Sequence, residues 1–342
     1  MIIEFFNNSE SNVIGGRMLN VSLLRVLAML MIVLFHCMCY NAGNWSVYPC
    51  ERPDDLTMDV ASVIVSIALP FFFFISGFLF AVIYKNKNGY RDWKAFLVGK
   101  LKRLILPTVT WTIIYLILLP FRYTVWEYIS GIRHLWFLPT LFVIFIIARL
   151  AAPFLLAKRK PYLDLIIAVA VIILTNFSSR IDNDDYLLLK NVLWYIPYFV
   201  TGMMFFKHRF RVNYKSIEVI ILLFLVGALA QMLLTPPFHG QSFLVTIVLI
   251  VICCLTFDLL SVVKMDKDSM ASCLLSNLDK NSMGIYLVHQ VLIMTLYQYT
   301  FFEESWLTYH PYIGPILLFI VVFPLSWAFA EAKRRLKLEP FL

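Results

Sequence analysis

The sequence contains few charged residues. Asp, Glu, Lys and Arg make up 15% of its 342 positions, whereas about a quarter is usual in soluble domains. Hydrophobic residues make up 61%, and the mean hydropathy is +0.80. No polar segment of domain size interrupts the long apolar runs. These values exclude an ordinary soluble domain and predict a single integral membrane domain.

The common signatures of soluble enzymes are also missing. The chain contains no P-loop, GxGxxG, GxSxG or HExxH motif, so the usual nucleotide-binding, serine-hydrolase and zinc-protease sites are not indicated. Its six cysteines include no CxxC pair, and only Cys50 falls in a predicted external loop. We therefore expect neither a disulfide framework nor a metal site. The net charge of +8 is explained by basic cytoplasmic loops rather than by nucleic-acid binding.

Ten apolar runs are long enough, or nearly long enough, to cross a bilayer, which takes about 20 residues. The predicted spans are 19–40, 58–84, 104–121, 135–156, 161–177, 191–206, 216–235, 242–263, 282–301 and 312–330. The first run lacks a small-residue cleavage site and is expected to stay as an anchor. The predicted fold is therefore an all-α bundle of about ten transmembrane helices.

The basic residues alternate between the loops of this bundle. If the N-terminus is inside, most Lys and Arg residues fall in cytoplasmic segments, as the positive-inside rule requires. The external segments hold only Arg52, Arg122, Arg133, Arg180 and Lys190. The pattern predicts cytoplasmic termini, with an N-terminal segment over 1–18, the membrane domain over 19–330 and a basic tail over 331–342.

The stretch RVLAMLMIVLFH places an arginine and a histidine inside the first span. Arg25 and His36 are eleven residues apart, about three helical turns plus roughly 20°, so they share one helical face with an axial separation of ~16 Å. Arg25 lies near the cytoplasmic end and His36 in the outer half. Ionisable residues inside a span usually face a bundle interior or cavity. The alternatives are that Arg25 extends to the headgroups and that His36 serves helix packing.

Two further segments carry small or basic residues at or near spans. In PFFFFISGFLF, Ser76 and Gly77 would let a helix or a ligand approach closely, and helix packing is the stronger interpretation for Gly77. In KAFLVGKLKRLILP, Lys100 and Arg103 share a face at the entrance of the third span. They are either ordinary positive-inside residues or a cationic cradle for phosphates.

Two other segments place histidines beside aromatic residues. In RHLWFLPTLF, His134 and Trp136 form either an interfacial anchor or an aromatic platform for a sugar. In NSMGIYLVHQ, Tyr286 and His289 share a face at i, i+3. His289 lies roughly two turns inside the ninth span, where a histidine has few purely structural explanations.

Six segments together resemble the membrane acyltransferase-3 family. They are Arg-x10-His in the first span, PFFFFISGFL in the second, Lys-x-x-Arg-x-x-x-Pro entering the third, HLWFLP opening the fourth, GMMFF closing the sixth and SMGIYLVHQ in the ninth. The resemblance covers roughly residues 20–335. Family members are ten-helix bacterial proteins of the plasma (inner) membrane.

This resemblance implies an enzyme that takes an acyl group, usually acetyl, from cytoplasmic acyl-coenzyme A. The acceptor would be a sugar hydroxyl of an envelope or exported polysaccharide or glycolipid. Some members carry an added SGNH hydrolase-like domain, and the short segment from Glu331 to Leu342 indicates the stand-alone kind. The expected partners are acyl-coenzyme A, the saccharide acceptor and membrane lipids, without a metal or nucleic acid.

The resemblance also implies roles for the residues singled out above. Arg103, Lys100 and Arg25 would hold the phosphates of the donor, and Arg25 would also be catalytic, together with His36 and His289. His36 would act as general base on the acceptor hydroxyl or relay the acyl group. His289 would polarise the thioester carbonyl or support the site. The acceptor would meet His134, Trp136, Tyr286 and Ser76.

Two other classes of function fit the composition. Ten helices with intramembrane charges also describe a transporter or flippase for a lipid-linked saccharide or small acid, but no inverted repeat or matched pair of broken spans is visible. A non-catalytic scaffold is the third class, and the retained Arg and His argue against it. Acetyl and longer groups such as succinyl are both compatible with the sequence.

Overall fold

The chain is helical through almost all of the residues that the structure, a computed structural model, describes. These residues are 13–14, 17–45, 50, 52–86, 90, 92–119, 122–178, 186–208, 243–299 and 310–338. Apart from an antiparallel pair of two-residue strands, β1 (Val13–Ile14) and β2 (Arg17–Met18), the regular elements in these ranges are helices. The predicted all-α class is confirmed.

The helices differ widely in length. Their bounds are α1 Leu19–Met38, α2 Asp55–Asn86, α3 Trp93–Lys100, the π-helical turn η3 Leu101–Ile105, α4 Leu106–Leu118, α5 Val125–Ser130, the 3₁₀ turn η4 Arg133–Trp136, α6 Phe137–Leu155, α7 Pro161–Ser178, α8 Leu187–His208, α10 Phe243–Ser261, α11 Met270–Tyr299 and α13 Ile313–Arg335.

Six helical stretches in the described ranges are long and apolar enough to cross a membrane. They are Leu19–Met38, Asp55–Lys85, Trp93–Leu118, Arg133–Leu155, Val245–Val262 and Ile313–Arg335. Helices also cover the fifth, sixth and ninth predicted spans, as α7, α8 and α11. The seventh predicted span, 216–235, lies outside the described residues. The count of ten helices and the cytoplasmic placement of both termini stay predictions.

Three predicted boundaries differ from the structure. The third span begins well before residue 104, because α3, η3 and α4 form one continuous helical stretch from Trp93. The ninth helix begins at Met270 instead of 282, so the polar sequence SNLDKNS is helical. The last helix continues past residue 330 to Arg335, so the first residues of the predicted tail belong to α13.

Helices α2 and α8 approach each other so closely that glycine is required on both. A Cβ atom on Gly77 of α2 would lie 1.9 Å from the carbonyl oxygen of Phe199, and one on Gly202 of α8 would lie 2.1 Å from that of Phe74. Small residues allow such contacts between membrane helices. The packing interpretation of Gly77 is therefore confirmed.

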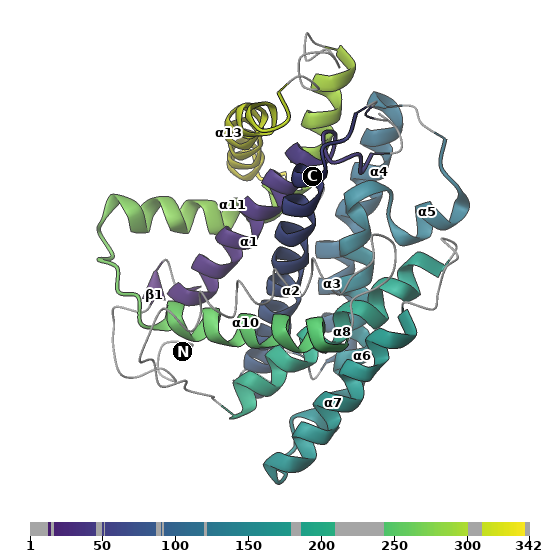
Figure 1. Cartoon of the computed structure of the whole chain (residues 1–342). Helices are drawn as coiled ribbons and strands as arrows, with labels where there is room; N and C mark the ends of the chain where they lie inside the picture. Colours follow the sequence, from purple (N-terminus) through teal and green to yellow (C-terminus); the bar gives the residue numbers. More distant parts are fainter. Residues whose placement is uncertain are drawn as a thin grey trace.

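The core of the molecule lies around α1 and α2 (Figure 1). Helix α1 packs against α2, α10, α11 and α13, and α8 packs against α2, α6 and α7. In Figure 1, α6, α7 and α8 lie on one side of α2, and α11 and α13 lie on the other. This arrangement brings α1 and α11, from opposite ends of the chain, into direct contact.

Candidate active site

Three histidines from distant parts of the chain meet in the core. His36 of α1, His134 of η4 and His289 of α11 have ring centroids 4.8 Å (His36–His289), 5.0 Å (His134–His289) and 5.9 Å (His36–His134) apart. His134 and His289 are buried, whereas His36 is partly exposed. The sequence singled out each histidine separately, and the fold brings all three together.

Two contacts align α1 with α11. His36 Nδ1 lies 3.1 Å from His289 Nε2, and the Arg25 guanidinium lies 2.5 Å from the Asp279 carboxylate. Ser22 also donates to Asp279, at 3.0 Å. Residue 25 of α1 pairs with residue 279 of α11, and residue 36 pairs with residue 289. The residue numbers therefore increase in the same direction on both helices, so the two helices are parallel along this contact.

Hydrogen bonds to main-chain carbonyls orient His36 and His289. His289 Nδ1 lies 3.1 Å from the Ile285 oxygen, so it carries the hydrogen in the neutral ring and leaves Nε2 as an acceptor. His36 Nδ1 lies 2.9 Å from the Ile32 oxygen and therefore donates to that oxygen and toward His289. In the neutral ring, His36 therefore carries its hydrogen on Nδ1, and Nε2 is an acceptor with a lone pair. No described residue donates a hydrogen bond to His36 Nε2.

His134 is fixed more completely than the other two. Its Nε2 donates to the Tyr286 carbonyl at 2.8 Å, and its Nδ1 accepts from the Tyr115 hydroxyl at 3.1 Å. Its backbone N–H donates to Gln290 Oε1 at 3.2 Å, and the Tyr286 hydroxyl donates to its carbonyl oxygen. With every polar atom occupied, His134 is suited to shape the site rather than to exchange a proton.

A strained turn delivers His134 to this position. Gly131 has φ +92°, and a Cβ atom there would lie 2.8 Å from the backbone of Leu135. Arg133 has φ 51°, which is uncommon for a residue other than glycine. Its Nε donates to the Tyr123 hydroxyl at 3.3 Å. Such backbone conformations persist where the surrounding structure fixes them, often at functional sites.

A row of aromatic rings leads from the histidines to Trp136. Trp136 stacks on Tyr195 with ring centroids 5.5 Å apart, and Tyr195 stacks on Phe73 at 4.4 Å. Phe73 contacts Phe137, which lies 5.5 Å from the Tyr286 ring. Trp136 itself is partly exposed. The rings form an apolar wall with one accessible end.

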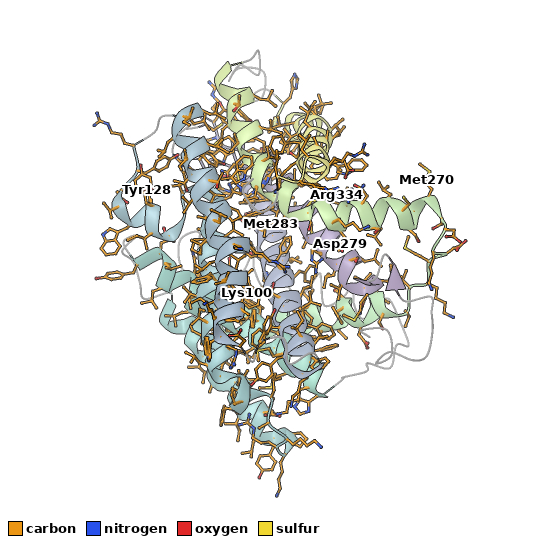
Figure 2. The ribbon with its side chains drawn as sticks, turned by 180° about the vertical axis from the view of Figure 1, so that it is seen from behind. Lys100, Tyr128, Met270, Asp279, Met283 and Arg334 are labelled. Atoms are coloured by element: carbon orange, nitrogen blue, oxygen red, sulfur yellow. The ribbon has the colours of Figure 1, made fainter. Side chains whose placement is uncertain are left out.

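The two predicted phosphate ligands of the third span have different surroundings. Lys100 Nζ lies 3.2 Å from the centroid of Phe145 and 5.3 Å from that of Tyr90, so aromatic faces surround this ammonium. Arg103 is exposed on the π-helical turn η3. No carboxylate among the described residues pairs with either side chain. Figure 2 shows Lys100 within the helical core, away from Asp279.

Ser76 is partly exposed on α2, and no hydrogen bond joins it to another of the described residues. Four residues of the site did not emerge from the sequence. Asp279 lies in a stretch predicted to be a loop, and Tyr115, Tyr195 and Gln290 are uncharged residues within apolar spans. Of these four residues, only Gln290 could have been suspected from the sequence, because it is a polar residue directly after the candidate His289.

The fold and the site thus define a multi-pass helical membrane protein with a histidine cluster in its core, in which His36 is the partly exposed member. Residues 18–331 match the model of the acyltransferase-3 family, described as an acyltransferase domain. The chain belongs to this family. No curated protein and no solved structure was found to match it.

Proposed function

We propose that the protein transfers an acyl group, most simply acetyl, from acyl-coenzyme A to a sugar hydroxyl of an envelope or exported polysaccharide or glycolipid. Acyl transfer itself follows from the family. The observation that carries the proposed chemistry is the open Nε2 of His36, whose tautomer is set by bonds on the opposite nitrogen.

His36 acts as the general base in this proposal. Its Nε2 takes the proton of the acceptor hydroxyl while the hydroxyl oxygen attacks the thioester carbonyl. A C–O bond forms, the C–S bond breaks, and the coenzyme A sulfur leaves with the proton that His36 returns. A positioned base of this kind contributes about 10²–10⁴-fold to the rate.

His289 is a positioning residue for that step. When His36 holds two protons, its Nδ1–H still donates to the Ile32 carbonyl and to His289 Nε2. These two acceptors stabilise the imidazolium and keep the ring in place, as the third member of a catalytic triad does.

Arg25 stays available to the donor in spite of its ion pair. Only its Nη1 bonds to Asp279, and its side chain is 21% exposed. An arginine carries five N–H donors, so the remaining edge is free to bind a donor phosphate or carbonyl. Lys100 lies away from Asp279 and so from Arg25 (Figure 2), and we propose it together with Arg103 as a separate contact for the donor's phosphates. At the other end, Trp136 offers a partly exposed ring to the acceptor sugar.

The test uses membranes and acetyl-coenzyme A carrying a labelled acetyl group. We expect label to enter polysaccharide with the parent protein and incorporation to fall about 10²–10⁴-fold in His36→Ala. His310→Ala is the control, because this histidine is exposed, whereas the cluster lies in the core. Label incorporation by His36→Ala at the parental rate would reject the general base. Movement of a solute without any incorporation would favour the transporter.

A further inference from the structure

A basic pocket lies between the N-terminal half of α11 and the end of α13. Its volume is about 280 Å³, and it is lined by Lys267, Ser272, Cys273, Ser276, Asn277, Lys280 and Arg334. Figure 2 shows Arg334 beside the stretch of α11 between Met270 and Asp279. None of these lining residues belongs to the site proposed above.

The lining includes the side chains of Lys267, Lys280 and Arg334 and no carboxylate. Lys267 and Lys280 are exposed, and no carboxylate in the described ranges pairs with either. Arg334 shares Glu331 with Arg335, so a single carboxylate faces two guanidinium groups. The pocket also borders the first turns of a 30-residue helix, whose N-terminal end bears partial positive charge.

The neutral residues complete a set of donors for an anion. Ser276 lies one turn before Lys280 on the same face of α11, and its hydroxyl makes no hydrogen bond to a described residue. Asn277 is held rigidly: its Oδ1 accepts from Trp327 at 2.7 Å, and its Nδ2 donates to Glu331 at 3.2 Å. Two ammonium groups and a hydroxyl around a small open pocket suit the oxygens of a phosphate.

We infer that this pocket, between Lys267, Ser276, Lys280 and Arg334, binds a phosphate group of a ligand. Its volume of about 280 Å³ is slightly below the usual range for ligand sites, and it fits a phosphate-bearing headgroup or one end of a nucleotide. Two kinds of ligand carry such a phosphate group, acyl-coenzyme A and an anionic phospholipid. The assignment to acyl-coenzyme A rests on the proposed function, whereas the assignment to a phospholipid does not.

The place of the pocket along α11 fits a donor that extends toward the histidines. Asp279, which pairs with Arg25, lies directly beside Lys280 in the sequence. His289 lies 13 residues beyond Ser276, about 20 Å along the helix. Along α11, the pocket is therefore followed first by Asp279 with its partner Arg25 and then by His289 with its partner His36.

The experiment compares Lys267→Gln/Lys280→Gln with Lys158→Gln/Lys160→Gln in the full chain. Both pairs are exposed lysines, so neither double substitution removes packing. Each protein is placed in nanodiscs of phosphatidylcholine alone and in nanodiscs that also contain phosphatidylglycerol. Binding of acetyl-coenzyme A is measured without acceptor, and the thermal midpoint is measured in both lipids.

The results separate the two ligands. We call Lys267→Gln/Lys280→Gln the pocket variant. If the pocket binds the donor, the Kd for acetyl-coenzyme A rises about tenfold or more in the pocket variant only. The rise in Kd is then smaller for the 3′-dephospho analogue of the donor. If it binds lipid, the donor Kd is unchanged, and the pocket variant alone loses the stabilisation by phosphatidylglycerol. The inference is overturned if the two double variants behave alike in both measurements.

Failure of the proposed function would look different. In that case the parent protein would not transfer acetyl groups and would not bind acetyl-coenzyme A, while the effect of phosphatidylglycerol would still distinguish the pocket variant from its control.

Discussion

Arg25 and Asp279 form a 2.5 Å ion pair between helices whose residues are 254 positions apart in the chain. Together with the contact between His36 and His289, this pair holds α1 and α11 in register. A sliding of one helix against the other would break both contacts at once. The ion pair therefore fixes the geometry on which the imidazole contact depends.

The two members of the ion pair are expected to respond differently to substitution. Asp279 is fully buried, whereas Arg25 is partly exposed. Arg25→Gln leaves a buried carboxylate without its cation, which typically costs about 3–5 kcal/mol. Asp279→Asn leaves an arginine that can still reach water, and it should cost less. The thermal midpoint should be lowest in Arg25→Gln and should recover when Asp279→Asn is added. Additive losses in the double variant would show that the two residues do not interact.

His289 offers a second prediction, about rate rather than stability. His289→Phe removes one of the two acceptors of His36 Nδ1–H, the other being the Ile32 carbonyl, and we expect kcat to fall by about 10²-fold or more with little change in the KM for the donor. His289→Gln keeps an oxygen acceptor at this position and should restore part of kcat. Steady-state kinetics with acetyl-coenzyme A measures both. A loss that is confined to KM would instead place His289 in donor binding.

The sequence singled out the three histidines as candidates, His36 and His289 because they lie inside apolar spans and His134 because it accompanies Trp136 at the start of one. It did not show that they meet, because contacts between helices depend on packing that no single span encodes. Asp279 was missed for a different reason. It lies in the polar sequence SNLDKNS, a composition typical of a loop, whereas the structure places this stretch within the helix α11.

Lys100 and Arg103 show a limit of the helical-periodicity argument. Their shared face was deduced from α-helical geometry, but the intervening residues form the π-helical turn η3, which changes the angle between successive side chains. The aromatic rings around Lys100 come from Phe145 of α6 and from Tyr90. These contacts, too, could not be read from the spacing of basic residues.

A third prediction concerns the contact between α2 and α8. Gly77→Ala places a methyl group 1.9 Å from the carbonyl oxygen of Phe199, and the backbone must move apart to accept it. Overpacking of this kind costs about 1–3 kcal/mol or more, so the thermal midpoint and the yield of folded protein should fall. Gly99→Ala is the control. Its Cβ would meet no atom within 4 Å, and alanine in a helix is favoured over glycine by roughly 0.5–1 kcal/mol. Equal effects of the two substitutions would contradict the close approach.

The last prediction concerns the start of α2. Asp54 accepts hydrogen bonds from the Thr57 hydroxyl and backbone N–H, both at 2.8 Å, and these bonds lower the pKa of its carboxyl. Loss of such a cap in Asp54→Ala should cost about 0.5–2 kcal/mol at neutral pH.

Because the folded-state pKa of Asp54 lies below that of the unfolded chain, its contribution is present above the unfolded pKa of about 3.9. It is lost as the pH falls through the folded-state pKa. The difference in thermal midpoint between the parent and Asp54→Ala should therefore shrink in acid. Asp54→Asn keeps the cap without a charge, so its stability relative to Asp54→Ala should stay constant over the same pH range. If the difference in thermal midpoint between the parent and Asp54→Ala also stays constant over this pH range, the charge of Asp54 contributes nothing to the cap.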